Sequence, residues 1–309
     1  MTQRIKYSVV IPVYNGEFYL EEVSHRIKNT FEKITDDYEL IFVDDGSKDQ
    51  SWKKLQEIQK KDEKIKIIKL SRNYGQHNAT LCGLRNGNGK YLLTLDQDLQ
   101  HPPEEIPKLI KKIEEGYSLV YGRYRKKKHH WFRNFGSKIT NKTLSKIAGR
   151  DFVITSFRII KKAAIDSLED FENPEVIIDI LLSQVISDRD IGVVLVNHKQ
   201  NKRDSNYSSF KLINISLNMI FNYTTAPLKI ASILGLIFSL LGFGTALFYV
   251  IKYSLGYTTI SGFTSVIAAV SFFSGLILLV LGVIGEYLGR IFVAVNKKPQ
   301  YKIEKRLIK

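Results

Sequence analysis

This 309-residue chain has one cysteine and two tryptophans, and it lacks the common glycine motifs that bind phosphate. The single cysteine, Cys82, excludes an internal disulfide framework and fits a reducing compartment, where it serves as a small buried apolar side chain. No GxGxxG follows the first apolar run, and GxxxxGK[ST] occurs nowhere. Both absences exclude a nucleotide held by a glycine-rich loop at a helix N-terminus.

Charge is absent from two long stretches near the C-terminus, residues 230–251 and 253–285. An apolar helix of about 20 residues crosses the hydrocarbon core of a bilayer. We therefore predict two transmembrane helices, at about 229–252 and 264–286. The alternative is a buried helical hairpin in a soluble domain, which is rarely this long and free of charge.

The distribution of charge predicts how these helices are oriented. The tail KKPQYKIEKRLIK (297–309) carries six Lys/Arg and one Glu, whereas the loop between the two stretches carries only Lys252. Basic flanks stay inside, and no signal peptide is recognised at the start of the chain. We expect a multi-pass protein of the inner (plasma) membrane with both termini in the cytoplasm.

The net charge of +15 has two general explanations, nucleic acid or an anionic membrane surface. The predicted spans favour the membrane. The basic stretches also lack the interleaved aromatic residues of a platform for single-stranded nucleic acid. We therefore expect no nucleic-acid partner.

Short apolar runs alternate with amphipathic ones over the first 125 residues. Such alternation predicts an α/β fold with a mostly parallel sheet and helices on both faces. The expected strands are 7–13, 39–45, 65–71, 90–96 and 117–122, and the expected helices are 17–34, 52–62, 76–86 and 103–115.

Polar residues follow four of these strands at the point where each one ends. They are Pro12, Tyr14 and Asn15; Asp44, Asp45, Gly46 and Ser47; Ser71, Arg72 and Asn73; and Asp96, Gln97 and Asp98. Ligands of such sheets bind outside the carboxyl ends of the strands. Solvated turns explain each cluster separately, but not four clusters at one edge of a sheet.

The stretch LDQDLQ offers hard oxygen ligands, which suit a divalent cation bridging a diphosphate. Asp96, Asp98 and Gln100 are the candidate ligands. A solvated turn between a strand and a helix is the alternative for this stretch taken alone.

The motifs VVIPVYNG, FVDDGSKD, LSRNYGQ and LDQDLQHPPE, in this order and spacing, resemble family 2 glycosyltransferases with the GT-A fold. Within that family the chain resembles the polyprenyl-phosphate branch, namely dolichyl-phosphate mannosyltransferases and bactoprenol (GtrB-like) glucosyltransferases. Two C-terminal stretches, SNYSSFKLINISLNMIFNYTTAPLKIASILG and VIGEYLGRIFVAVNKKPQY, extend the resemblance over nearly the whole chain.

The resemblance implies a division of the chain and a homo-oligomer, a tetramer in bacterial relatives. The expected parts are a GT-A catalytic domain over 1–205, a juxtamembrane segment over 206–228, the helix pair within 229–290 and a basic cytosolic tail over 291–309. Residues 208–226 would form either interfacial helices or an ordinary connector.

The resemblance also assigns roles to single residues. Nucleotide binding is implied for Pro12, Tyr14, Glu17, Asp44 (at the base), Asp45 (at the ribose), Arg72 and Asp96, and binding of a metal ion, Mg²⁺ or Mn²⁺, for Asp96, Asp98 and Gln100. Gln76, His77 and Asn78 differ from the residues that many relatives carry at these positions, which leaves donor recognition open.

Eight Lys/Arg and no acidic residue lie between Arg123 and Lys142. The resemblance implies that Arg123 and Arg133 contact phosphates of the donor or of the lipid, and a guanidinium can bind phosphate in a bidentate manner. For residues 126–128 we expect a solvated basic surface beside the membrane.

The acceptor side of the site is less defined. Asp151 opens DFVITSFRII, which resembles a family element of the acceptor pocket, and a catalytic role there competes with a capping role. Asp179 could stand where other members keep a general base, with Glu175 on the same stretch, although a lipid phosphate is already anionic near pH 7. Arg203, with Lys202 second, is the candidate for the acceptor phosphate.

These observations predict a metal-dependent inverting glycosyltransferase that moves one sugar from a nucleotide sugar, with UDP favoured, to undecaprenyl phosphate. One alternative is a processive polysaccharide synthase, but its QxxRW motif and further spans are absent. The other is a membrane scaffold that binds a nucleotide sugar or lipid without turnover, which does not explain the intact acidic set.

Overall fold

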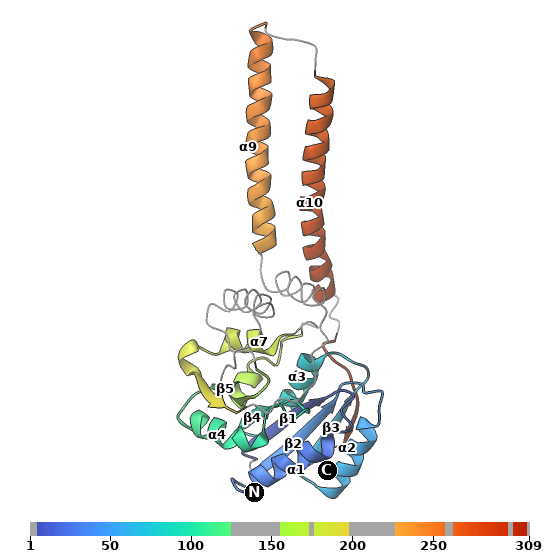
Figure 1. Cartoon of the computed structure of the whole chain (residues 1–309), viewed down its shortest axis with the longest axis vertical. Coiled ribbons are helices and arrows are strands. Elements are labelled where there is room, and N and C mark those ends of the chain that lie inside the picture. Colours follow the sequence, from blue (N-terminus) through green and yellow to red (C-terminus); the bar gives the residue numbers. More distant parts are fainter. Residues whose placement is uncertain are drawn as a thin grey trace. The chain divides into compact units, whose positions relative to one another are not determined.

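The computed structural model describes residues 5–124, 155–172, 176–197, 226–256, 262–295 and 299–307 (Figure 1). The chain divides into two compact units, one of residues 1–206 with 297–309 and one of residues 207–296. The strands are β1 (Tyr7–Val13), β2 (Tyr38–Asp44), β3 (Ile65–Leu70), β4 (Tyr91–Thr94), β5 (Leu119–Tyr124), β6 (Arg158–Lys161), β7 (Ile191–Val196) and β8 (Ile303–Leu307). The helices are α1 (Leu20–Phe31), α2 (Ser51–Lys61), α3 (Gln76–Asn86), α4 (Ile106–Glu114), α6 (Lys162–Asp166), α7 (Ile178–Val185), α9 (Ala226–Ser254) and α10 (Phe263–Val295), with the 3₁₀ turns η1 (Pro103–Glu105) and η2 (Asp188–Asp190).

The first unit is built on an eight-stranded mixed sheet in the order β7-β5-β6-β4-β1-β2-β3-β8. Strand β1 pairs in parallel with both β2 and β4, and β5 pairs in parallel with β7. Strand β6 is antiparallel to β4 and β5, and β8 is antiparallel to β3. The predicted α/β class with a mostly parallel sheet is confirmed.

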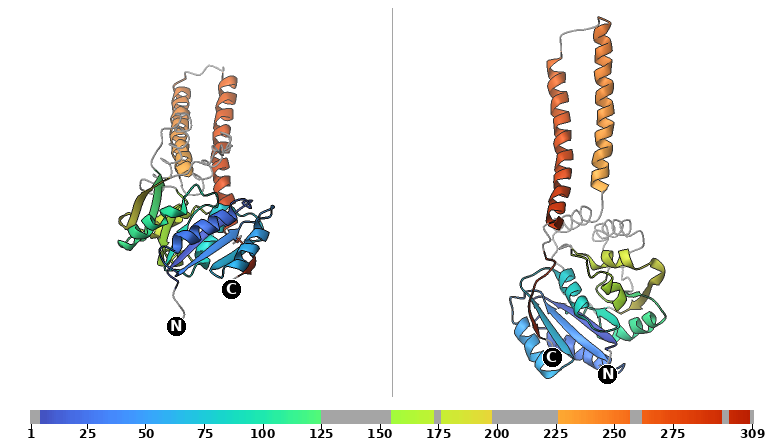
Figure 2. Two further views of the ribbon diagram at one scale, coloured as in Figure 1. Left: turned by 60° about the horizontal axis from the view of Figure 1, so that its bottom comes forward. Right: turned by 180° about the vertical axis from the view of Figure 1, so that it is seen from behind.

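Both faces of the sheet are covered by helices (Figures 1 and 2). Successive side chains of a strand point to opposite faces, and β1 follows this rule, because Val9 and Ile11 join one core cluster and Val10 the other. Helices α1, α2 and α4 supply the first cluster, and α3, α6 and α7 the second. The central strands β1, β2 and β4 are buried at every position and mostly apolar because helices cover both of their faces.

The local predictions agree with the structure to within a few residues over the first 124 positions. Strand 7–13 and helix 76–86 have the predicted bounds. The predicted helix 103–115 begins as the turn η1 and continues as α4, with Pro103 at the first position of the turn, where a proline costs no hydrogen bond.

The end of the chain forms a strand that the sequence reading did not identify. In β8, Ile303 pairs with Leu70 and Leu307 with Ile67. Gln300 is buried, and Tyr301 packs against the second core cluster. In KIEKRL, apolar Ile303 and Leu307 stand among charged residues, as in an edge strand with one partly covered face. Because most of the stretch is charged, the sequence resembles a solvated tail.

The second unit contains the two long helices α9 and α10 (Figure 1). Each has an 18-residue window apolar enough to cross a membrane, Pro227–Gly244 and Phe272–Gly289. Only 6% and 0% of these windows are buried within the protein. Such exposure is unlike the core helix of a soluble domain, in which an apolar helix of this length is covered.

Candidate functional site

The candidate site lies where the carboxyl ends of β1 and β4 meet. From these neighbouring strands the chain continues in opposite directions along the sheet, from β1 toward β2 and from β4 toward β5 and β6, and open α/β sheets bind ligands at such a place. The side chain of Gln97 joins them: its Oε1 accepts from Tyr14 N at 3.3 Å, and its Nε2 donates to Tyr14 O at 3.0 Å. A Cβ on Gly16 would overlap Oε1 of Gln97, so a larger residue there would displace the Gln97 side chain from these two hydrogen bonds.

The loops after β1 and β2 are joined by polar contacts. Asn15 N donates to Ser47 Oγ at 3.0 Å, and Lys48 N donates to Asn15 Oδ1 at 2.8 Å. Glu17 accepts from Gln50 N at 2.8 Å. Glu17, expected to line the nucleotide pocket, therefore also holds the start of α2.

Strained backbone is concentrated at this site. Among the described residues, Asn15 (φ 48°) and Leu99 (φ 58°) are the non-glycine residues with positive φ. Asparagine tolerates this region, but for leucine it is uncommon. Both follow the ends of the central strands, where such strain commonly accompanies function.

Asp44, the candidate contact for the base, is fully buried at the end of β2. Its Oδ1 accepts from Ser47 N at 3.2 Å, whereas its Oδ2 has no hydrogen-bond partner among the described residues. Burial raises the pKa of Asp44, opposed by the hydrogen bonds from Ser47. A buried acceptor without a donor matches the N–H group of a nucleobase.

Asp45, expected at the ribose, already has two partners. Its oxygens accept from Tyr74 N at 2.7 Å and Gly75 N at 2.8 Å. Burial raises the pKa of Asp45 to about 6, opposed by those two amides and reinforced by Asp44. The described contacts make Asp45 the anchor of the loop between β3 and α3, and its role at the ribose stays a prediction.

Asp96, at the end of β4, is held from two sides. Its Oδ1 accepts from Gln76 Nε2 and its Oδ2 from Ser156 Oγ, both at 2.5 Å. His101 Nδ1 lies 3.8 Å from Oδ2. Burial raises the pKa of Asp96, while Ser156, Arg158 and Gln76 oppose the shift.

Asp98 and Gln100, two of the predicted metal ligands, are hydrogen-bonded to each other. Gln100 N donates to Asp98 Oδ1 at 3.2 Å and Gln100 Nε2 to Oδ2 at 2.8 Å. The left-handed conformation of Leu99 turns the chain so that Gln100 reaches back to Asp98. In this arrangement the amide nitrogen of Gln100 faces the carboxylate, so Gln100 supports Asp98, and its role as a third ligand stays a prediction.

The donor set can be compared with what a divalent cation requires. Among the residues that the structure describes, no group of three or more His, Cys, Asp or Glu side chains forms a metal site by itself. Mg²⁺ commonly binds through one or two carboxylates together with substrate phosphates and water. Asp96 and Asp98 fit that mode, in which the nucleotide completes the coordination.

Asp179 lies in a buried ion pair beneath this site. Its Oδ1 accepts from Arg158 Nη1, and from Tyr121 Oη at 3.0 Å. Arg158 Nε also donates to Thr94 Oγ1 at 3.2 Å. Asp179 is 1% exposed and its Oδ1 is occupied by these two donors, which argues against the base role considered for it.

The remaining predicted residues are distributed unevenly. Pro12 is buried inside β1 and pairs with Val43, whereas Tyr14 is 40% exposed at the site. Arg72 lies over the ring of Tyr74 at 4.8 Å. Arg123 is exposed near the end of β5. The predicted residues Arg133, Asp151 and Arg203, with Glu175 and Lys202, lie outside the described residues.

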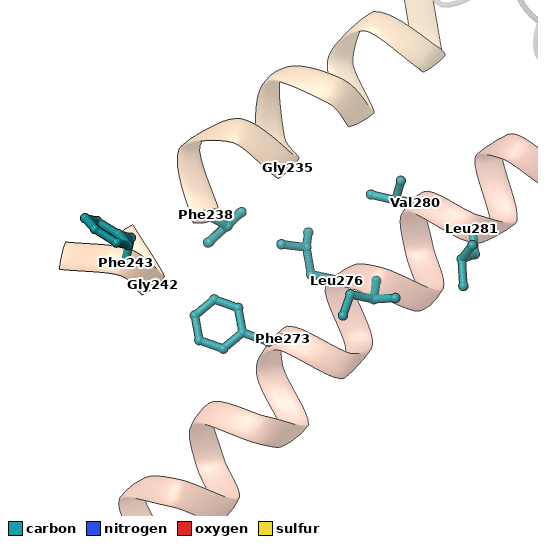
Figure 3. A pocket seen from close by; sticks show the side chains of 9 residues that line it. Gly235, Phe238, Gly242, Phe243, Phe273, Leu276, Val280 and Leu281 are labelled. Carbon is teal, nitrogen blue, oxygen red and sulfur yellow. The ribbon is translucent and has the colours of Figure 1, made fainter. Parts of the chain in front are cut away.

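An apolar cavity of about 500 Å³ lies within the second unit, between α9 and α10 (Figure 3). Phe238 and Gly242 of α9 and Phe273 and Leu276 of α10 help to line it. None of its lining side chains can ionise or bind a metal, so the cavity has no group that could perform the chemistry of the polar site.

Comparison with known proteins identifies the family. The family described as "Glycosyl transferase family 2" matches residues 8–168, which include β1 to β6. The chain belongs to glycosyltransferase family 2. The undecaprenyl-phosphate 4-deoxy-4-formamido-L-arabinose transferase of Proteus mirabilis (strain HI4320) is 37% identical over 305 residues, 97% of this chain and 93% of that protein. The uncharacterized glycosyltransferase YkcC of Bacillus subtilis (strain 168) is 34% identical over 99% of this chain and 95% of its own length. The predicted resemblance to the polyprenyl-phosphate branch is confirmed.

Solved structures confirm the GT-A fold of this glycosyltransferase. Glucosyl-3-phosphoglycerate synthase from Mycobacterium tuberculosis, in complex with Mn²⁺, UDP-glucose and phosphoglyceric acid, matches with a TM-score of 0.54 and 20% identity. The match covers 70% of this chain and 77% of that structure. At this level of identity the likeness concerns the fold.

Several residues of the glycosyltransferase site were not singled out from the sequence. They are Ser156, Arg158, His101 and Tyr121. Arginine is rarely buried, so nothing in TSFRII predicts a guanidinium that is 2% exposed. The available signal was the polar Thr94 inside the apolar run YLLTLD, because a buried hydroxyl requires a partner.

Proposed function

We propose that this glycosyltransferase is membrane-anchored and transfers a single sugar, with inversion, from a nucleotide sugar to polyprenyl phosphate. The observation that carries this proposal is the 37% identity to an undecaprenyl-phosphate sugar transferase over 97% of the chain, because this match includes both long helices. A likeness limited to the catalytic unit would not address the acceptor. UDP is the favoured nucleotide, and undecaprenyl phosphate the favoured acceptor.

Asp44 gives the base an acceptor in a buried place. Its Oδ2 would accept the N–H of a uracil ring, while Ser47 holds its Oδ1. Tyr14, exposed beside it, offers an aromatic ring against which a base can pack. Asp45 would contribute indirectly, because it accepts hydrogen bonds from the backbone of Tyr74 and Gly75 and so fixes that loop.

Asp96 and Asp98 would hold Mg²⁺ or Mn²⁺ together with the donor. When bound, such an ion neutralises negative charge that develops on the departing diphosphate. Gln100 would hold Asp98 in place through its two hydrogen bonds. Arg123, with Arg133, would bind phosphate oxygens of the donor or of the lipid.

The reaction requires no general base. An oxygen of the lipid phosphate would form a bond to the anomeric carbon, and the bond from that carbon to the diphosphate would break, leaving a nucleoside diphosphate. The phosphate oxygen is already anionic near pH 7. The burial of Asp179 and its ion pair with Arg158 support this view, because they leave the one candidate base inaccessible to substrate. The protein then contributes mainly by holding the lipid phosphate and the sugar donor in a reactive orientation.

The two long helices would form a hairpin that crosses the membrane twice. The chain leaves the catalytic unit before residue 207 and belongs to it again from residue 297. The chain on either side of the hairpin thus belongs to one unit, so both ends of the hairpin would lie on one face of the membrane. The excess of Lys/Arg after α10 favours the cytoplasmic face.

A transfer assay tests the proposal. Full-length protein in detergent or nanodiscs is supplied with undecaprenyl phosphate and a panel of UDP-, GDP- and dTDP-sugars that includes UDP-4-deoxy-4-formamido-L-arabinose. The expected product carries one sugar on the lipid phosphate. A long polymer would support a processive synthase, and nucleotide binding without turnover across the panel would support a scaffold.

A further inference from the structure

Asp96 faces Ser156 because of the register between β4 and β6. These antiparallel strands pair Thr94 with Arg158. Continuing the same register by two residues places Asp96 opposite Ser156. Since side chains two apart lie on one face of a sheet, Thr94, Asp96, Ser156 and Arg158 share the face covered by α3 and α7.

The carboxylate of Asp96 is held at both oxygens on that face. Ser156 Oγ reaches Oδ2 and Gln76 Nε2 reaches Oδ1, each at 2.5 Å. Hydrogen bonds to ionised acceptors are the short and strong ones. A carboxylate has about four lone-pair positions, so each oxygen keeps one direction for a further partner.

A buried network supports the donor on the β6 side. Thr94 Oγ1 donates to Ser156 O at 2.5 Å and accepts from Arg158 Nε at 3.2 Å. Arg158 is in turn paired with Asp179. Ser156 is therefore fixed through its own backbone, and its hydroxyl has little freedom to leave Asp96.

We propose that Ser156 and Gln76 are positioning residues for Asp96, orienting its free lone pairs toward the donor diphosphate and its cation. The proposal rests on the proposed function, since it concerns the binding of a nucleotide with a divalent cation. The buried network fixes Ser156, which bonds Oδ2 of Asp96. Gln76, which is exposed at the start of α3, bonds Oδ1. Neither residue needs to touch the reacting atoms.

The test measures binding as well as turnover. Full-length Ser156→Ala, Ser156→Thr, Gln76→Ala and Asp96→Asn are titrated by calorimetry with UDP in the presence of Mn²⁺, and kcat and KM are measured for lipid transfer. Losing a hydrogen bond to a charged group is expected to weaken Mn²⁺-UDP binding about tenfold or more. Threonine at 156 keeps the hydroxyl and should restore most of the affinity.

Two controls separate positioning from general structure. Ser167→Ala removes a hydroxyl whose Oγ donates to Ala164 O at 2.9 Å, away from the site, and should bind as the wild type does. In the Asp96→Asn background, Ser156→Ala should cause little additional loss if Ser156 acts through Asp96. Gln76→Ala gives the same readout if Ser156→Ala does not fold.

The outcomes distinguish this inference from the proposed function. The positioning role alone would be overturned if both Ser156→Ala and Gln76→Ala bound Mn²⁺-UDP with wild-type affinity. It would also be overturned if Ser156→Ala weakened this binding as much in the Asp96→Asn background as in the wild type. If the wild-type protein binds none of the Mn²⁺ complexes of UDP, GDP and dTDP, both proposals are overturned.

Discussion

Arg158 and Asp179 form an ion pair in which the two side chains are only 3% and 1% exposed. The pair joins β6 to α7, and Tyr121 of β5 adds a third contact. Burying two charges is costly unless each is paired and its other polar atoms are bonded. The pair therefore specifies how β4, β5, β6 and α7 fit together beneath Asp96.

Breaking this pair should destabilise the catalytic unit strongly. Arg158→Met leaves Asp179 buried without its counter-charge, and the expected loss is about 3–5 kcal/mol of unfolding free energy. Denaturant unfolding followed by tryptophan fluorescence, to which Trp52 on the core contributes, measures it. The double variant Arg158→Met/Asp179→Leu should recover much of the loss. As a matched control, Lys162→Ala breaks the exposed pair with Asp166 and should cost less than about 1 kcal/mol.

The strands and helices of the first 124 residues were predictable because the spacing of apolar residues within each segment indicates a strand or a helix. Val9 and Val10 occupy opposite core clusters, and the apolar stripe of α1 faces the sheet. The acidic cluster was predictable too, since Asp96 and Asp98 follow a strand directly.

The pairing partners were not predictable, because they depend on register across the chain. Ser156 lies close enough to bond Asp96 only because β6 pairs antiparallel with β4. Arg158 pairs with Asp179, which lies twenty-one positions later in the chain. Strand β8 was missed for another reason: its pairing with β3 lies more than 230 residues away along the chain, and its charges resemble those of a solvated tail.

Asp45 should make the stability of the protein depend on pH. Burial, together with the neighbouring charge of Asp44, raises the pKa of Asp45 from its ordinary value of 3.8 to about 6 in the folded protein. A raised carboxyl pKa means that the folded state holds the proton more tightly. Its contribution to stability is therefore complete below about pH 4 and is lost as the pH rises through 6.

Asp45→Asn removes this titration, although its one amide oxygen can accept from only one of Tyr74 N and Gly75 N, so the variant should also lose some stability that does not depend on pH. From pH 4 to pH 7 the wild type should lose up to about 3 kcal/mol relative to the variant, from about two units of pKa shift. Unfolding of both proteins across that range measures the difference. Parallel curves would show that Asp45 has the same pKa in both states.

Removing divalent cations should abolish transfer, and adding Mg²⁺ or Mn²⁺ should restore it. Asp98→Ala removes a candidate ligand and should lower kcat/KM by about a hundredfold or more, as loss of a charge-stabilising group does in other enzymes. Asp62→Ala, which removes a carboxylate paired with Lys28 on the surface, is the matched control. Transfer that survives both chelation and Asp98→Ala would contradict the metal assignment.

The hairpin makes a prediction about topology. In a Cys82→Ser background, Ser254→Cys at the end of α9 should react with an impermeant maleimide from outside intact cells. Glu57→Cys, exposed on α2, should react only after the membrane is permeabilised. Equal labelling of both positions from one side would show that the two helices do not cross the membrane as a hairpin.

The return of the chain to the sheet should be essential for the stability of the catalytic unit. Arg85 of α3 links the end of the chain to the segment after α6: its Nη1 donates to Gln300 Oε1 at 2.7 Å, and its Nη2 to the carbonyls of Leu168, Glu169 and Phe171. Arg85→Lys keeps the charge but loses the forked geometry, so it should not rescue Arg85→Ala.

Gln300→Ala removes one of these bonds and should cost about 1 kcal/mol, whereas Arg85→Ala leaves three carbonyls without their donor and should cost several. Deleting residues 299–309 exposes the edge of β3 and should destabilise the catalytic unit at least as much. Unfolding midpoints of the full-length variants give the order. If the deletion is as stable as the wild type, β8 is a dispensable attachment. If it is the least stable, the strand beyond the second long helix is an integral part of the catalytic sheet, and the hairpin is anchored to that sheet at both ends.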